Sequence, residues 1–298
     1  MRQTCIFCAK PLDNSDEHII PDSLNGRLHT KELICKKCNA HFGTNLDPIL
    51  KEALGAQLHF LGFDNAPSLI LSDDKGEKYK LDKNGKITGI KVTAEKIEQD
   101  GMPGVAVSGQ MEQAAKAFAK KMVRTFGKEE TLNAVMNRQF VVVEKQIVPN
   151  ELVAENPLQV TPRLLLAIEK IMVEYYAHCG LNIESISDRL ESIYQIDESK
   201  ANVKLCNFRQ QVRKPATDET SHLILIRSIP ETKQLIAYLE LFNVLCAYTI
   251  LDNDYSGPDV DFSYHQDALT GDKLDQKVEL HLENTEEQEP KFDFWETI

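Results

Sequence analysis

The chain has 298 residues, of which 42% are hydrophobic and 27% are charged, and its formal net charge is −12. This is the composition of a globular protein, and the length allows one large or two modest domains. No apolar run is long enough to cross a bilayer, so we expect no membrane partner. Because a cysteine motif begins at Cys5, we expect no signal peptide, and a cytoplasmic protein with reduced thiols.

The negative charge is unevenly distributed along the chain. Residues 1–51 contain seven Lys or Arg and six Asp or Glu, whereas residues 252–298 contain fourteen acidic residues and three lysines. An acidic body does not exclude nucleic acid as a partner; it predicts a local basic footprint and marked salt dependence. From about residue 283 we expect a mobile acidic tail.

Two cysteine pairs dominate the N-terminal region. Cys5 and Cys8 form one C-x-x-C motif, Cys35 and Cys38 form a second, and 26 residues separate them. Paired motifs of this kind hold one tetrahedral zinc ion through four thiolates. The other three cysteines lie in apolar surroundings and are predicted to be ordinary buried thiols (Cys179, Cys206 and Cys246).

Short elements are expected around these motifs. Ile19-Ile20 suits a strand that ends at the proline after it, and Asn25-Gly26 is a turn signal. A helix is expected within residues 39–50, where Gly43 and Pro48 limit its length.

Residues 66–108 are predicted to be rich in β-strands, with a hairpin whose turn is Asn84-Gly85. Apolar residues at helical spacing predict a helix over residues 111–126, which ends before Gly127.

Two further helices and two apolar segments follow. Thr161-Pro162 is typical of a helix start, and we expect that helix to run to Gly180, with another over residues 182–195. The runs 222–226 and 235–251 are interpreted as buried strands, although periodicity alone leaves a helix open. The fold class expected from these elements is α+β.

Glu17-His18 lies between the cysteine pairs, and Asn39 follows the second pair directly. Adjacent residues of a strand point to opposite sides, so one side chain can bind a divalent metal ion while the other faces an attacking water. The alternative is a surface acid beside a histidine close to the zinc ion.

The whole pattern resembles the HNH endonucleases, which have the ββα-metal fold, and within them the subgroup with four zinc-binding cysteines. The resemblance covers about residues 3–50 and rests on the two C-x-x-C motifs, on Glu-His-Ile-Ile-Pro at 17–21, and on Cys38-Asn39 with Phe42-Gly43. It implies that His18 is the general base. It also implies that Glu17 and Asn39 bind a catalytic Mg²⁺ or Mn²⁺ ion, while the cysteines bind structural zinc.

The sequence departs from the family in two places. Glu17 stands where Asp is more frequent in the family. The middle asparagine, which braces the loop between the two strands, has no clear match, and Glu32 is nearest to its place.

Other residues are weaker candidates. Lys36 and Lys37 are candidates for substrate binding, and His29 is a candidate for substrate contact. We interpret His41 as a packed or solvated histidine in preference to a metal ligand. Asp47 either braces the end of the N-terminal zinc-binding finger or belongs to an Asp-Pro turn. A basic stripe could contact phosphates but is more often a solvated helix face (Lys116, Lys120, Lys121 and Arg124).

We therefore expect an HNH nuclease domain with structural zinc at residues 1–56. Residues 57–298 are expected to form an α+β domain for specificity, regulation or assembly, through which the chain binds itself or a regulatory partner. The expected function is metal-dependent hydrolysis of phosphodiester bonds in DNA, with a role in bacterial defence against phage suggested by the resemblance. The alternatives are a ribonuclease and a zinc module that binds nucleic acid or a partner without cutting.

Overall fold

The computed structural model describes residues 2–72, 78–84, 86–89, 93–99, 102–108, 111–129, 153–154, 159–206, 212–213, 220–275 and 279–280. They form a mixed α+β structure that divides into two compact units. Unit 1 comprises Met1–Gln57 and Gln159–Ile298, and unit 2 comprises Leu58–Leu158. This division differs from the sequence-based one, because the segment after residue 158 packs with residues 1–57, which we call the finger. Within the described segments, no helix combines the length and the apolar character that a bilayer crossing requires.

The N-terminal finger has the expected ββα order. Strand β1 (Glu17–His18) pairs antiparallel with β2 (His29–Thr30), with the 3₁₀ helix η1 (Asp22–Leu24) between them. The strand begins earlier than expected, and Ile19 and Ile20 lie in the bend after it. Both isoleucines are fully buried, so they form part of the finger's core.

Two helices take the place of the single one expected within residues 39–50. Helix α1 (Lys36–Asn45) already begins after Cys35, and α2 (Asp47–Ala53) follows it directly. Pro48 lies in the first turn of α2, where the missing N–H is not needed for the helix. Helix α3 (Gly55–Phe60) lies at the sequence boundary between the two units.

Helix α6 (Pro162–His178) is the central element of unit 1. The Thr161 hydroxyl accepts a hydrogen bond from the Leu164 N–H, which confirms the predicted start, and Gly180 follows the helix with φ +78°. Every residue from Leu166 to Ala177 is buried. Helix α6 contacts α2 on the finger side and strands of the large sheet, so it has no solvent-facing side over this stretch.

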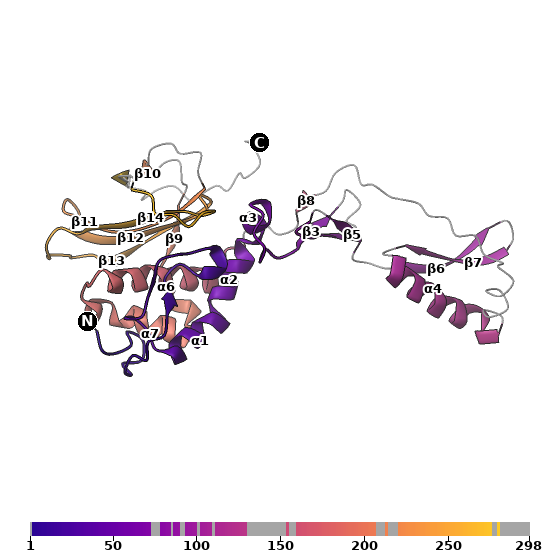
Figure 1. Ribbon diagram of the computed structural model, residues 1–298, viewed down its shortest axis with the longest axis horizontal. Coiled ribbons are helices and arrows are strands. Elements are labelled where there is room, and N and C mark those ends of the chain that lie inside the picture. The colour runs from indigo at the N-terminus through magenta and orange to yellow at the C-terminus, as the bar shows by residue number, and fades with distance from the viewer. Residues whose placement is uncertain are drawn as a thin grey trace. The chain divides into compact units, whose positions relative to one another are not determined.

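The large sheet has five antiparallel strands in the order β14-β11-β12-β13-β9. The predicted apolar runs are thereby confirmed as strands, and the strand bounds are β9 (Lys204–Leu205), β11 (Ser221–Ile229), β12 (Gln234–Leu241), β13 (Leu245–Asp252) and β14 (Asp261–Asp267). In Figure 1, α6 and α7 lie on one face of this sheet. The smaller elements of this part are η2 (Ile183–Ile186), α7 (Ser187–Gln195), η3 (Glu198–Lys200) and the paired strands β10 (Val212–Arg213) and β15 (Glu279–Leu280).

The finger is fastened to the sheet by the loop between its two strands. The Asn25 side-chain amide donates to the backbone oxygens of Ala268 (2.8 Å) and Leu269 (3.0 Å), just after β14. Buried His222 of β11 lies 2.9 Å through Nε2 from the Leu24 backbone oxygen. These contacts join residues about 200 or more positions apart, so the finger and the C-terminal sheet form one packed unit.

Unit 2 contains a four-stranded sheet, a separate hairpin and a helix. The sheet has the order β5-β4-β3-β8. As predicted, residues 66–108 are rich in strands and residues 111–126 are helical. The bounds are β3 (Leu69–Ser72), β4 (Lys78–Leu81), β5 (Ile87–Gly89), β6 (Thr93–Gln99), β7 (Met102–Ser108), β8 (Val153–Ala154) and α4 (Met111–Phe126). Helix α4 packs against the hairpin of β6 and β7.

Candidate functional site

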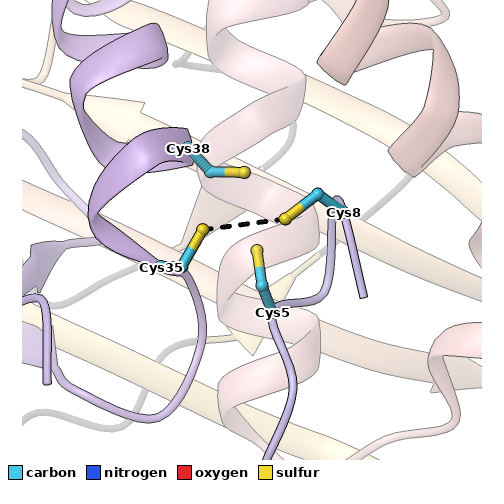
Figure 2. A group of neighbouring side chains, drawn as sticks. All are labelled: Cys5, Cys8, Cys35 and Cys38. Carbon is cyan, nitrogen blue, oxygen red and sulfur yellow. Dashed lines mark hydrogen bonds between the residues drawn. The ribbon is translucent and has the colours of Figure 1, made fainter. Parts of the chain in front are cut away.

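The four N-terminal cysteines converge as their spacing predicted. Cys5 and Cys8 lie in a turn before β1, Cys35 precedes α1, and Cys38 lies in its first turn. Figure 2 shows the four sulfur atoms directed toward a common centre. All four Sγ atoms lie within 4.8 Å of one another, and those of Cys8 and Cys35 are 3.6 Å apart. Tetrahedral zinc with Zn–S bonds of about 2.3 Å places its sulfurs about 3.8 Å apart, so the cluster fits a zinc ion.

Burial of three of these cysteines disfavours charged sulfurs unless a cation binds beside them. Cys38 is fully buried, and Cys5 and Cys35 are nearly so. Burial, and then the sulfurs of Cys8 and Cys5, raise the pKa of the Cys38 thiol far above its ordinary value. Thiolates in this position therefore need a positive ion beside them.

A cavity of about 300 Å³ lies beside the strands and helices of the finger. It brings together the three residues expected to act on the substrate, because Glu17, His18 and Asn39 all line it. The other lining residues are Asp16, Pro21, Asp22, Ser23, Gly43, Asp47, Pro48 and Lys51. Four lining residues are carboxylic acids and one is a lysine, so the cavity attracts a cation.

His18 is half-buried and stacks on the histidine opposite it in β2. His18 and His29 are register partners, and their ring centroids are 5.5 Å apart with an interplanar angle of 27°. His29 Nδ1 lies 2.9 Å from Asp16 Oδ1. The hydrogen bond from His29 lowers the pKa of Asp16, which keeps that carboxyl group ionised.

Asn39 holds the loop that precedes β1. Its side-chain Nδ2 donates to the Asp16 backbone oxygen (2.9 Å) and to Ser15 Oγ (3.2 Å). Because the amide nitrogen makes these two bonds, the amide oxygen is the atom that can bind a metal ion.

Glu17 is held from behind by a lysine of α6. Lys170 is fully buried, and its Nζ lies 2.7 Å from Glu17 Oε1, 3.4 Å from Asp47 Oδ1 and 3.3 Å from Glu174 Oε2. The same Nζ lies 5.5 Å from the centroid of the Phe42 ring. Glu17 is 3% exposed, yet it lines the cavity. Glu17 therefore pairs with the lysine and also forms part of the cavity wall.

The cluster contains three carboxyl groups and one lysine, so its charges do not balance if all four groups are ionised. Burial alone would lower the pKa of Lys170, but the charges of Glu174, Glu17 and Asp47 outweigh it and raise the pKa, so the lysine is charged. Burial, and then the charge of Glu17, raise the pKa of Glu174 well above its ordinary value. Glu174 therefore tends to hold a proton.

Sequence reasoning missed Lys170 and Glu174. A signal was present, because residues 164–177 are apolar on more than one face, as in a buried helix. A lysine and a glutamate four residues apart in such a helix must be buried with partners.

The remaining candidates lie away from the cavity lining. Lys36 and Lys37 are exposed at the start of α1, where Asp13 accepts the Lys36 backbone N–H (2.9 Å). His41 packs against α7, with Nε2 3.0 Å from the Tyr194 backbone oxygen. His41 is therefore a packed histidine, the reading that the sequence favoured.

Other sequence predictions concern residues outside the finger. On α4, Lys120 and Arg124 are exposed and Lys121 is half-buried, whereas the side chain of Lys116 lies outside the described residues. The other three cysteines are free thiols. Cys246 is buried as expected, whereas Cys179 and Cys206 are only half-buried. The acidic tail from residue 283 lies outside the described residues.

Comparison with known families supports the resemblance found in the sequence. Residues 5–54 match the model of the HNH endonuclease family. This match spans the cysteine cluster, both strands of the finger, α1 and α2. No curated protein and no solved structure matches the chain.

Proposed function

We propose that this protein is a metal-dependent endonuclease that hydrolyses phosphodiester bonds in DNA. The observation that carries the proposal is the shared cavity of Glu17, His18 and Asn39, inside the segment that matches the HNH endonuclease family. The cysteine cluster lies in the same finger, and we assign it a structural zinc ion. The finger's role is thus catalysis, and zinc holds its two halves together.

His18 is assigned the role of general base. An imidazole is the usual group that takes a proton from an attacking water near neutral pH. His18 lines the cavity and is the last residue of β1, opposite His29. A water between this ring and a phosphate in the cavity would lose its proton to the imidazole.

Glu17 and Asn39 are assigned to a divalent metal ion, Mg²⁺ or Mn²⁺. The cavity offers carboxylate and amide oxygens, which are the ligands that these hard cations prefer. Lys170 orients the Glu17 carboxylate, and the bonds from Asn39 Nδ2 orient its amide group. When bound, the ion supplies positive charge that offsets the charge developing on the scissile phosphate.

Lys36 and Lys37 are assigned to the substrate outside the cavity. Both are exposed at the N-terminal end of α1, which carries the second cysteine pair. Lysine side chains there can contact phosphates on either side of the scissile bond and hold the strand in register.

Cleavage of supercoiled plasmid tests the proposal. Wild type with Mg²⁺ or Mn²⁺ should nick or linearise the plasmid, and EDTA should stop the reaction. His18→Ala should lose activity by about a hundredfold or more, as expected for a general base. His178→Ala, which alters an exposed histidine at the end of α6, should cut like wild type. Equal activity of wild type and His18→Ala would refute the assignment.

Two alternative functions are compatible with the same site. The chemistry does not depend on the sugar, so parallel digests of DNA and RNA decide between deoxyribonuclease and ribonuclease. Binding without cutting is favoured by one observation, the ion pair that occupies Glu17 Oε1. Tight DNA binding with no cleavage under any divalent metal would support it.

A place in bacterial defence against phage is part of the proposal and follows from the resemblance to the HNH family. Plaque counts on cells that express wild type or His18→Ala test it. Equal counts would remove this part and leave the nuclease assignment unaffected.

A further inference from the structure

The proposed base, His18, has little to hold its ring in place. The His18 ring stacks on the ring of His29, at a centroid distance of 5.5 Å. No hydrogen bond to the His18 ring is recorded among the described residues. The direction of its nitrogen atoms therefore depends on the neighbouring ring.

His29 is itself fixed, although its side chain is 54% exposed. Its Nδ1 is 2.9 Å from Asp16 Oδ1, so the ionised carboxylate accepts the Nδ1–H. Asp16 in turn is held at its backbone oxygen by Asn39 Nδ2 (2.9 Å). A chain of contacts thus runs from α1 through the loop before β1 to His29 and then to His18.

We propose that His29 is a positioning residue for the proposed hydrolysis, whose ring sets the plane of the His18 imidazole. The inference rests on the proposed function and deepens it. His29 is not among the residues that line the cavity, so it acts through His18 and not on the substrate. The contact between His29 and Asp16 joins β2 to the loop before β1.

The plane of the base matters because a proton moves along the line between water and the ring nitrogen. General-base catalysis needs that nitrogen within hydrogen-bond reach and in the correct direction. A ring free to rotate spends less time in that orientation, and a small misplacement in an active site lowers the rate by one to two orders of magnitude.

Two substitutions separate stacking from chemistry. His29→Ala removes the ring, and His29→Phe keeps an aromatic face for His18 while removing both nitrogen atoms. At saturating Mg²⁺, His29→Ala should lower kcat about tenfold with KM for plasmid within about twofold of wild type. His29→Phe should restore kcat to within about threefold of wild type, because the stacking surface remains.

The opposite results would overturn the inference. It fails if His29→Ala keeps the wild-type kcat, because a ring that positions His18 cannot be removed without a loss of rate. Zinc content and melting temperature, measured on the same samples, should stay at wild-type values, and a loss of either would mean that His29 is structural instead.

A readout that needs no activity separates this inference from the proposed function. In full-length protein with ring-labelled histidine, the His18 signal is identified by its loss in His18→Ala. That signal should shift or broaden in His29→Ala and stay sharp in His29→Phe. An unchanged His18 signal in His29→Ala overturns the positioning role alone, whereas no cleavage by wild type overturns the proposed function and this inference with it.

Discussion

Replacing one cysteine of the cluster tests how much the finger depends on its metal ion. Cys38→Ser removes the most deeply buried of the four sulfurs, and the other three remain within 4.8 Å of one another. Three thiols and a hydroxyl hold zinc poorly, so we expect bound zinc to fall from about one per chain to near zero.

The expected loss of stability is large. A structural zinc ion contributes about 10–16 kcal/mol of apparent binding free energy, which is comparable with the whole stability of a domain, about 5–15 kcal/mol. Even a loss of about 4 kcal/mol would lower the melting temperature by about 8–16 °C in a unit of this size. Because the finger packs on α6, the transition of unit 1 as a whole should move.

Two measurements decide the outcome. Zinc released by a thiol reagent is counted with a chromophoric chelator, and the melting temperature is measured by calorimetry. Cys179→Ser is the matched control, because it alters a half-buried cysteine outside the cluster and should keep both zinc and melting temperature. Full zinc occupancy in Cys38→Ser, or an unchanged melting temperature after zinc is lost, would refute the reasoning.

Two further predictions concern stability. Gly26→Ala should lower the free energy of unfolding by about 3 kcal/mol or more, because a Cβ there would lie 2.0 Å from the Ile20 backbone oxygen. Gly43→Ala should raise it by up to about 1 kcal/mol, because it adds a methyl group to α1 with nothing within 4 Å. The midpoints of urea unfolding measure both changes, and equal midpoints for the two variants would contradict the argument. Glu174→Gln should change the pH profile of stability. The raised pKa of Glu174 means that the folded chain binds this proton more tightly than the unfolded chain, so wild type loses stability as pH rises above the ordinary value of 4.5. Glutamine cannot ionise, so the advantage of Glu174→Gln over wild type should grow as the pH rises above 5, and a constant difference would show that folding does not raise the pKa of Glu174.

Local patterns accounted for most of the elements. The spacing of the cysteines predicted their convergence, and the Thr161-Pro162 start of α6 is confirmed by its cap. The apolar runs after residue 221 are strands, as their density indicated. These features depend on residues close in sequence, so a single sequence contains the necessary information.

Long-range contacts could not be predicted in the same way. Lys170 reaches Glu17 across 153 positions, and in a helical pattern a lysine is ordinarily assigned to the solvent side. Asn25 was recognised as a turn residue, but its side chain bonds the segment after β14, 243 positions away. Neither partner can be inferred from spacing, because each contact depends on how α6 and the sheet pack against the finger.

Similar reasoning explains the division of the chain. The sequence predicted a boundary near residue 56, where the finger motifs end. The structure instead groups residues 1–57 with residues 159–298, because Lys170, His222 and the end of β14 all contact the finger.

The fastening of the N-terminal finger to the C-terminal sheet has a consequence during synthesis on the ribosome. Residues 1–57 emerge first, but their partners on α6 and after β14 are translated only when most of the chain has been made. At about 5–20 residues per second, the Asn25 contact must wait more than about ten seconds. A chain that ends before residue 170 would carry the cysteines and His18 without the lysine behind Glu17, so we expect the proposed cleavage to be absent from such fragments.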